Sequence, residues 1–166
     1  MTRFSGFTLV EIMIVVIILG ILAGLTLPAF SNVSRESKES MLQEDLRIMR
    51  QQIGCYKAQH NDVAPGYPGG DSTQSPTADD FVAQMKKFTD ELGNISEVRT
   101  DVFRFGPYMR DQPKNSINLL KDIIVVGDAD EVSSSGVHGW YYKPAESIWK
   151  AGNEGADSTG KTYFNY

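Results

Sequence analysis

The sequence predicts an α+β fold in which one long N-terminal helix packs against a small antiparallel sheet and a second short helix. Three observations lead to this prediction. Residues 12–34 carry no charge, residues 42–56 repeat apolar side chains at steps of four and three, and short β-branched or aromatic runs follow residue 122. With 166 residues, 41% hydrophobic and 22% charged, the chain has room for one modest domain rather than a multidomain enzyme.

The first part of the long helix is apolar enough to cross a bilayer. A helix rises about 1.5 Å per residue, so the uncharged stretch from Ile12 to Ser34 covers the roughly 30 Å hydrocarbon layer. The short flank at residues 1–6 carries Arg3 and no acidic residue, which predicts that it stays in the cytoplasm. We therefore expect a leader peptide at 1–6, a transmembrane or filament-core helix at 7–30, and an exported head at 31–166 that includes the second half of the helix.

Glu11 is a charge inside the membrane-entering segment, where it needs a functional reason. A charged side chain near the centre of a spanning helix costs about 2.5–3.5 kcal/mol on insertion scales. A secretory signal peptide is the alternative interpretation, but its apolar region is shorter and ends at small residues. Leu25-Thr26-Leu27-Pro28 offers no such cleavage site.

The string Gly6-Phe7-Thr8-Leu9-Val10-Glu11 resembles the cleavage and methylation site of type IV prepilins. The resemblance implies that a prepilin peptidase cuts after Gly6 and methylates the new amine of Phe7, and that Glu11 occupies the family's acidic position. In a filament, the Glu11 carboxylate would meet the cationic Phe7 amine of a neighbouring subunit. Such a charge-assisted pair in an apolar surround would fix the axial register of the subunits.

Gly20 and Pro28 fall where the N-terminal helices of type IV prepilins carry a glycine and a proline. Glycine lowers helix propensity, and proline removes a backbone donor. We therefore expect a bend or a melted stretch between these two positions.

Residues 31 to about 60 continue the helix in amphipathic form. The expected core stripe consists of Leu42, Leu46, Met49, Ile53 and Tyr56. Cys55, the only cysteine, lies beside this stripe and is expected to be a half-buried free thiol. A single cysteine excludes an internal disulfide and any multi-cysteine metal site.

A surface loop rich in Gly, Pro, Ser and Asp is expected at 61–76, followed by a second helix. Thr77 with Asp80 resembles a capping box, and the helix is expected to end near Gly93. Its apolar stripe comprises Phe81, Met85, Phe88 and Leu92.

Three short antiparallel strands are expected after residue 121. They fall at Asp122–Gly127, Trp140–Tyr142 and Ser147–Trp149, the last two flanking a turn at 143–146. The aromatic side chains of this hairpin either join the core or form an exposed platform. The tail from Gly152 is expected to be poorly ordered except where Tyr163 and Phe164 dock.

A second resemblance, to the major (G-type) pseudopilins of type II secretion, rests on the order of three features: Gly106-Pro107-Tyr108, the strand that follows, and Gly139-Trp140-Tyr141-Tyr142 with Pro144-Ala145. Residues 61–94 depart from the pattern of these pseudopilins. This resemblance implies a calcium ion in a C-terminal loop. The candidate ligands are Asp128, Asp130 and Glu131, close to the serines at 133–135, because calcium takes six to eight oxygen ligands. A solvated acidic loop is the alternative interpretation, and no other cofactor is expected.

These features predict a structural subunit rather than an enzyme. The common nucleotide, zinc-protease and hydrolase motifs do not occur, and a net charge of -5 disfavours nucleic-acid binding. We expect a pseudopilin of a type II secretion-like system in the inner membrane. Its expected partners are copies of itself, the prepilin peptidase, the assembly platform, minor pseudopilins and the membrane.

Three alternatives stay open at this stage. The first is a true type IV pilin for adhesion, motility or DNA uptake, although such pilins commonly close a C-terminal loop with a disulfide. The second is a membrane-tethered binding module whose contact surface is the loop at 61–76 with the aromatic hairpin. The third is a secreted enzyme with an unusual signal sequence, which the long apolar run and Glu11 oppose.

Overall fold

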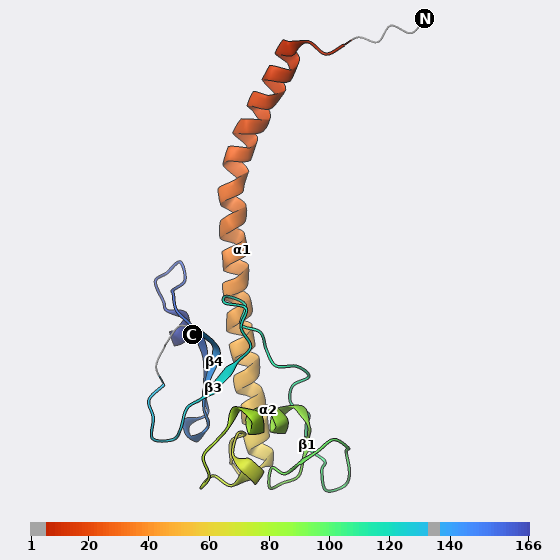
Figure 1. Cartoon of the computed structure of the whole chain (residues 1–166), viewed down its shortest axis with the longest axis vertical. Helices are drawn as coiled ribbons and strands as arrows, with labels where there is room; N and C mark the ends of the chain where they lie inside the picture. Colours follow the sequence, from red (N-terminus) through yellow and green to blue (C-terminus); the bar gives the residue numbers. More distant parts are fainter. Residues whose placement is uncertain (1–5, 133–136) are drawn as a thin grey trace, which may run out of the picture. The chain divides into compact units, whose positions relative to one another are not determined.

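The computed structural model describes residues 6–132 and 137–166, without the side chains of 25–32 and of Val137. The chain forms two compact units, Met1–Lys38 and Glu39–Tyr166. Helix α1 (Leu9–Gln59) contributes to both of them (Figure 1). The second unit adds helix α2 (Ala78–Lys86) and short strands, so the predicted α+β class is confirmed.

The core of the second unit is built on the predicted stripe of α1. The five stripe side chains, Leu42, Leu46, Met49, Ile53 and Tyr56, are 0–3% exposed. The helix ends at Gln59, close to the predicted end, and Asn61 and Asp62 follow with φ of 54° and 65°. Cys55 is exposed rather than half-buried, because it points away from the stripe beside it.

A three-stranded sheet in the order β3-β4-β5 packs on this stripe. Strands β4 (Val137–Lys143) and β5 (Ile148–Asn153) pair antiparallel around the short turn Pro144–Glu146, as predicted. Strand β3 (Ile123–Val125) instead pairs with β4 in parallel. The expectation that all three strands are antiparallel is therefore wrong, because β3 and β4 begin at the same end of the sheet.

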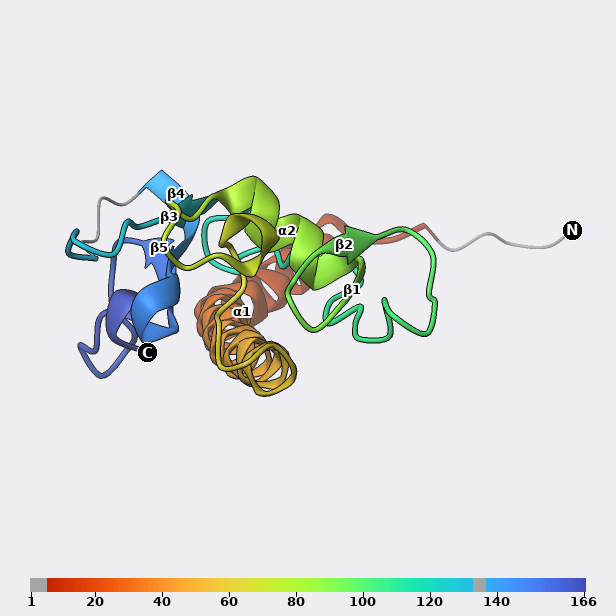
Figure 2. The same cartoon turned by 90° about the horizontal axis from the view of Figure 1, so that it is seen from below.

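The aromatic residues of the hairpin belong to the core. Trp140, Tyr142 and Trp149 are fully buried, and Trp140 and Trp149 stack with ring centroids 5.4 Å apart. Phe81 of α2 stacks on Trp149 at the same centroid distance. Figure 2 shows α2 and the sheet on the same side of the second-unit part of α1. These rings therefore fill the space between α2, the sheet and the α1 stripe.

Helix α2 starts as predicted but ends early. The backbone N–H of Asp80 donates to Thr77 Oγ1 at 3.0 Å, which completes the N-cap. The helix ends at Lys86 rather than near Gly93, and Leu92 is 65% exposed. Strand β1 (Phe88–Thr89) pairs with β2 (Ile95–Ser96), and Thr89 exchanges two backbone hydrogen bonds with Phe105. Residues 88 and 89 therefore form hydrogen bonds with residues further along the chain instead of extending α2 by another turn.

The C-terminal tail docks on the second unit through Tyr163. Its hydroxyl donates to Glu39 Oε1 at 2.9 Å, and the single turn Tyr163–Asn165 follows β5. Arg50 Nη2 donates to the carbonyl oxygens of Trp149 and Tyr166 at 2.9 and 3.0 Å. The tail is thus joined to α1 at two separate positions.

Candidate functional site

The candidate site is the start of α1. Residues 6–8 have no regular secondary structure, and the helix begins at Leu9. The first helical hydrogen bond runs from the N–H of Ile12 to the carbonyl of Thr8 at 3.3 Å. Phe7 is 81% exposed. The peptide bond between Gly6 and Phe7, predicted as the processing position, therefore lies outside the helix and next to an exposed side chain.

Glu11 and Thr8 form a reciprocal capping box. The backbone N–H and the hydroxyl of Thr8 donate to Glu11 Oε2 at 2.8 and 2.9 Å, and the N–H of Glu11 donates to Thr8 Oγ1 at 3.2 Å. The sequence patterns above assign no role to Thr8. The signal is nevertheless present, because a threonine followed three residues later by a glutamate is the capping-box pattern.

The carboxylate of Glu11 is only partly used by this cap. The two bonds that reach the carboxylate both end on Oε2, and the third uses the backbone N–H of Glu11. In the described part of the chain, Glu11 Oε1 therefore accepts no hydrogen bond. A carboxylate offers about four acceptor positions on its two oxygens. Glu11 is exposed and can therefore accept a further donor while it holds the helix start.

The part of α1 that follows is apolar on every side. The described aliphatic side chains between Leu9 and Leu22 are each about half exposed or more. They are Leu9, Val10, Ile12, Met13, Ile14, Val15, Val16, Ile17, Ile18, Leu19, Ile21 and Leu22. A helix that is hydrophobic all round is normally covered by lipid or by other protein.

Among the residues whose side chains are described, none of the helices offers a stretch of sufficient length and hydrophobicity to cross a bilayer. The span predicted at 7–30 includes side chains outside the described set and stays a prediction. The bend expected between Gly20 and Pro28 also stays a prediction. A Cβ added at Gly20 would meet no atom within 4 Å, and the side chain of Pro28 is not among the described ones.

The candidate calcium ligands do not belong to a cluster of three or more carboxylate, histidine or cysteine side chains in the described part of the chain. Asp128 Oδ1 accepts the hydroxyl of Tyr67 at 2.9 Å, and burial together with this carboxylate raises the pKa of Tyr67 to about 12. Asp130 closes a turn by donating its N–H to Gly127. Within the described ranges no three His, Cys, Asp or Glu side chains gather closely enough to hold a metal ion. Residues 133–136, part of the predicted loop, lie outside those ranges.

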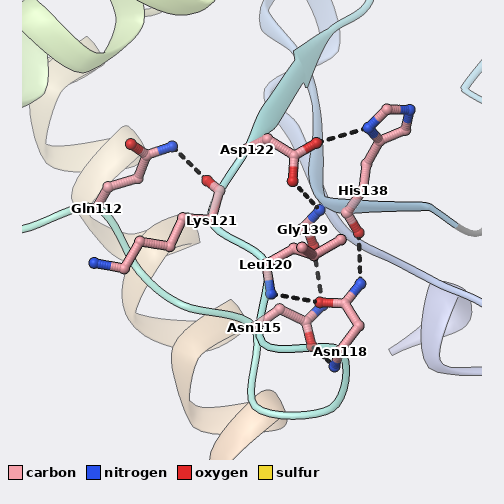
Figure 3. A network of polar contacts seen from close by, with 8 residues as sticks. All are labelled: Gln112, Asn115, Asn118, Leu120, Lys121, Asp122, His138 and Gly139. Atoms are coloured by element: carbon pink, nitrogen blue, oxygen red, sulfur yellow. Dashed lines mark hydrogen bonds and ion pairs between the residues drawn. The ribbon is translucent and has the colours of Figure 1, made fainter.

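A polar network at the start of β4 is the other concentration of titratable groups (Figure 3). Asp122 Oδ2 lies 2.6 Å from His138 Nδ1, and the N–H of Gly139 donates to Asp122 Oδ1 at 3.0 Å. Burial opposes ionisation of Asp122, but the bonds from His138 and Gly139 hold its pKa below the ordinary value. Asn118 donates to the carbonyl of His138 at 2.7 Å. The network therefore ties the preceding loop to β4.

The surface expected for a binding module does not form as predicted. The aromatic side chains of the hairpin are buried, which makes the exposed-platform interpretation wrong. The loop at 61–76 is also partly internal. Gln84 accepts the N–H of Gly66 at 2.7 Å and donates to the carbonyl of Tyr67 at 2.8 Å. These contacts fix the loop to α2.

Comparisons with known proteins agree with the N-terminal geometry. Residues 1–27 match the family model described as the prokaryotic N-terminal methylation motif. The type II secretion system core protein G of Pseudomonas aeruginosa is 42% identical over 53 residues, which are 32% of this chain and 37% of that protein. The protein of the same name from Aeromonas hydrophila is 34% identical over 77 residues, 46% of this chain and 54% of that protein.

These matches confirm the resemblance to type IV prepilins and to G-type pseudopilins. The chain spans between about a third and about half of the length of the curated relatives it matches. No solved structure matches it. Both relatives are core proteins of a secretion system by name, in agreement with the expectation of a structural subunit rather than an enzyme.

Proposed function

We propose that the chain is a structural subunit of a pseudopilus in a type II secretion-like system, processed after Gly6 and assembled through α1. The observation that carries the proposal is the capped start of α1: an exposed, non-helical Gly6–Phe7 bond, a Thr8–Glu11 capping box and an apolar helix whose described side chains between Leu9 and Leu22 are exposed. The similarity to core protein G supports the same function.

The non-helical conformation of residues 6–8 suits processing at this position. A peptidase must bind the scissile bond in an accessible, extended conformation, which a helix does not offer. Cleavage after Gly6 would leave Phe7 as the first residue, directly before the N-cap Thr8. The capping box would then hold the new terminus at the beginning of the helix, with the methylated amine within a few residues of the Glu11 carboxylate.

Assembly would use the unoccupied oxygen of Glu11. In an apolar surround a lone carboxylate costs about 2.5–3.5 kcal/mol on insertion scales. The cationic Phe7 amine of a neighbouring subunit would remove that cost by pairing with Oε1, while Oε2 keeps its bonds to Thr8. Any other axial offset would leave a charge unpaired. We therefore assign Glu11 the role of setting the subunit register.

The proposed location follows from the same segment. Residues 7–30 would anchor the precursor in the inner membrane as a single span, with residues 1–6 in the cytoplasm and the head exported. The partners would be the prepilin peptidase, the assembly platform, minor pseudopilins and further copies of the chain. The catalytic steps, cleavage and methylation, would belong to the peptidase.

The first test is the intact mass and the N-terminal residue of the protein recovered from membranes. We expect an N-methylated Phe7 start. A Met1 start would show that no peptidase acts on the chain. Cleavage beyond residue 30 would show a freely secreted domain, and either result would refute the proposal.

The second test separates assembly from insertion. Glu11→Ala removes a charge from an apolar helix, so membrane insertion should be unaffected while incorporation into filaments is lost. Glu44→Ala is a matched control, because Glu44 is an exposed glutamate of the head that pairs with Arg47 at 2.7 Å. Normal assembly of the Glu11 variant would refute the register role.

A further inference from the structure

Strand β3 is an edge strand whose outer side has no strand partner in the described part of the chain. Asp122 accepts the N–H of Trp140 at 3.0 Å, and Val126 donates to the carbonyl of Tyr142 at 2.8 Å. In a parallel ladder the backbone groups alternate between the two sides of a strand. The N–H and C=O of Ile123 and Val125 therefore point away from β4, and within the described ranges nothing hydrogen-bonds to them.

The outer side of β3 already accepts one donor at its beginning. The side-chain amide of Gln112 donates to the carbonyl of Lys121, the outward-facing position before Ile123 (Figure 3). Gln112 thus takes the place that a backbone N–H of an added strand would occupy. Its contact marks where the open edge starts and shows that this side of the strand is reachable by a donor.

An open groove of about 690 Å³ lies between this edge and α2. Ile123 and Asp122 border it on the sheet side, and Ala78, Val82 and Ala83 line it on the helix side. The helix contributes small side chains, so the groove has an apolar wall with room for an aliphatic group. An extended chain in the groove would place alternate side chains against this wall and its backbone against β3.

The charges around the groove favour a basic occupant. Lys87 pairs with Glu97 at 2.7 Å, and Lys86 lies 3.9 Å from Asp111. Asp79 is exposed on the same helix, and no cation in the described ranges pairs with it. A second copy of this chain would bring a net charge of -5 towards this carboxylate. A partner segment with a lysine or arginine complements it better.

We propose that β3 and α2 form a docking groove for an extended segment of a different polypeptide, which adds to the outer edge of β3. The segment carries an aliphatic side chain over Ala83 and a basic side chain next to Asp79. Unpaired backbone donors and acceptors select a peptide over a lipid or a sugar, because only an extended peptide supplies both groups in alternation. The edge is short, which suits a transient contact.

The test uses the full-length chain in cells that carry the complete secretion machinery. A photo-crosslinking benzoylphenylalanine replaces Ala83, and irradiated adducts are digested and mapped by mass spectrometry. The same probe at Ala58, exposed on α1 away from the groove, is the control. We expect adducts from position 83 to map to one segment of another polypeptide, with the Ala58 probe giving none to that segment.

Two variants and one exchange measurement test the geometry. Asp79→Lys should lower the adduct yield about tenfold by reversing the complementary charge, whereas Asp101→Lys, the same change outside the groove, should not. A synthetic peptide of the mapped segment should slow amide exchange at Ile123 and Val125. Ile124 and Val126, whose N–H groups face β4, serve as internal controls and should not change.

Several results would overturn the proposal. They are adducts only to lipid, adducts between copies of this chain, a mapped segment that binds as a helix, and no adduct at position 83. Unchanged exchange at Ile123 and Val125 in the presence of the peptide would also refute edge pairing. Filament formation of the probe-bearing chain is measured in parallel, so failure here is distinguishable from failure of the proposed pseudopilin function.

Discussion

Replacing His60 with phenylalanine should destabilise the second unit and remove part of its pH dependence. The ring is 2% exposed and stacks on Tyr56 with centroids 3.7 Å apart. Nδ1 lies 2.7 Å from the carbonyl oxygen of Tyr56, which only accepts, so Nδ1 carries the proton. Nε2 lies 2.9 Å from Thr89 Oγ1 and accepts its hydroxyl. The structure therefore holds a neutral imidazole between two buried partners.

Phenylalanine keeps the stacking and loses both hydrogen bonds. Thr89 is completely buried, and leaving a buried polar group unsatisfied costs about 1–3 kcal/mol. The carbonyl of Tyr56 lies in the last turn of α1, where His60 donates its own N–H to Lys57 instead. Two groups thus lose the imidazole as a partner, and the free energy of unfolding near pH 7.5 should fall by about 2–6 kcal/mol.

The pH dependence has a definite sign. Burial lowers the pKa of His60, and the Tyr56 carbonyl and the charge of Asp90 oppose this only in part. In the unfolded chain the pKa of histidine is about 6.5. The unfolded chain therefore binds more protons than the folded chain at mildly acidic pH. This contribution to stability is complete above the unfolded pKa. It is lost as pH falls towards the folded pKa, by at most about 1.4 kcal/mol per pH unit.

The assay is urea unfolding of the full chain in detergent at several pH values between about 5 and 8, the range in which histidine titrates. Trp140 and Trp149 are the only tryptophans and are both buried in the second unit, so their fluorescence reports its unfolding. The carboxylates that do not contact His60 contribute equally to wild type and His60→Phe and cancel in that difference. His138→Asn is the control, because it removes the other histidine. Parallel pH profiles for wild type and His60→Phe would refute the buried neutral imidazole.

Four further outcomes are expected. Gly6→Ala should block processing, and a normally trimmed mass would contradict the proposed cleavage position. Thr8→Ala should weaken the helix start by about 1 kcal/mol and lower filament yield, while Thr8→Ser, which keeps the hydroxyl, should restore it; equal yields for both would show that the cap has no role in assembly. Leu46→Ala, in the core stripe, should cost about 2–5 kcal/mol in urea unfolding, and a smaller loss would mean that the stripe is not packed. Calcium bound at Asp128 should raise the melting temperature of the full chain, and a midpoint unchanged by chelator would exclude it.

The long helix and its buried stripe could be predicted because their signals are local. Steps of four and three along α1 place Leu42, Leu46 and Met49 on one face whatever they contact. The end of α2 and the direction of β3 depend on partners far along the chain. Phe88 continues a helical spacing, yet its neighbour Thr89 pairs with Phe105. No pattern within the helix itself indicates that competitor.

The candidate site divides in the same way. Glu11 is visible in the sequence because a charge in an apolar run is rare and costly. The hydrogen bonds between Glu11 and Thr8 were recognised only in the structure, although the three-residue spacing of the two side chains is that of a capping box. The calcium ligands were inferred from the resemblance and from closely spaced oxygen donors, and in the described ranges they do not join a cluster of three or more acidic, histidine or cysteine side chains. Proximity in sequence is a weak guide to convergence of side chains in space.

The contacts that join the tail to α1 also determine when the second unit can fold. Glu39 bonds to Tyr163, and Arg50 bonds to Trp149 and Tyr166, partners that lie 124, 99 and 116 positions further along the chain. These contacts cannot form before residues 149–166 have been translated, long after α1 itself. The apolar stripe of α1 therefore stays uncovered by these partners during most of the time that residues 39–166 are being translated.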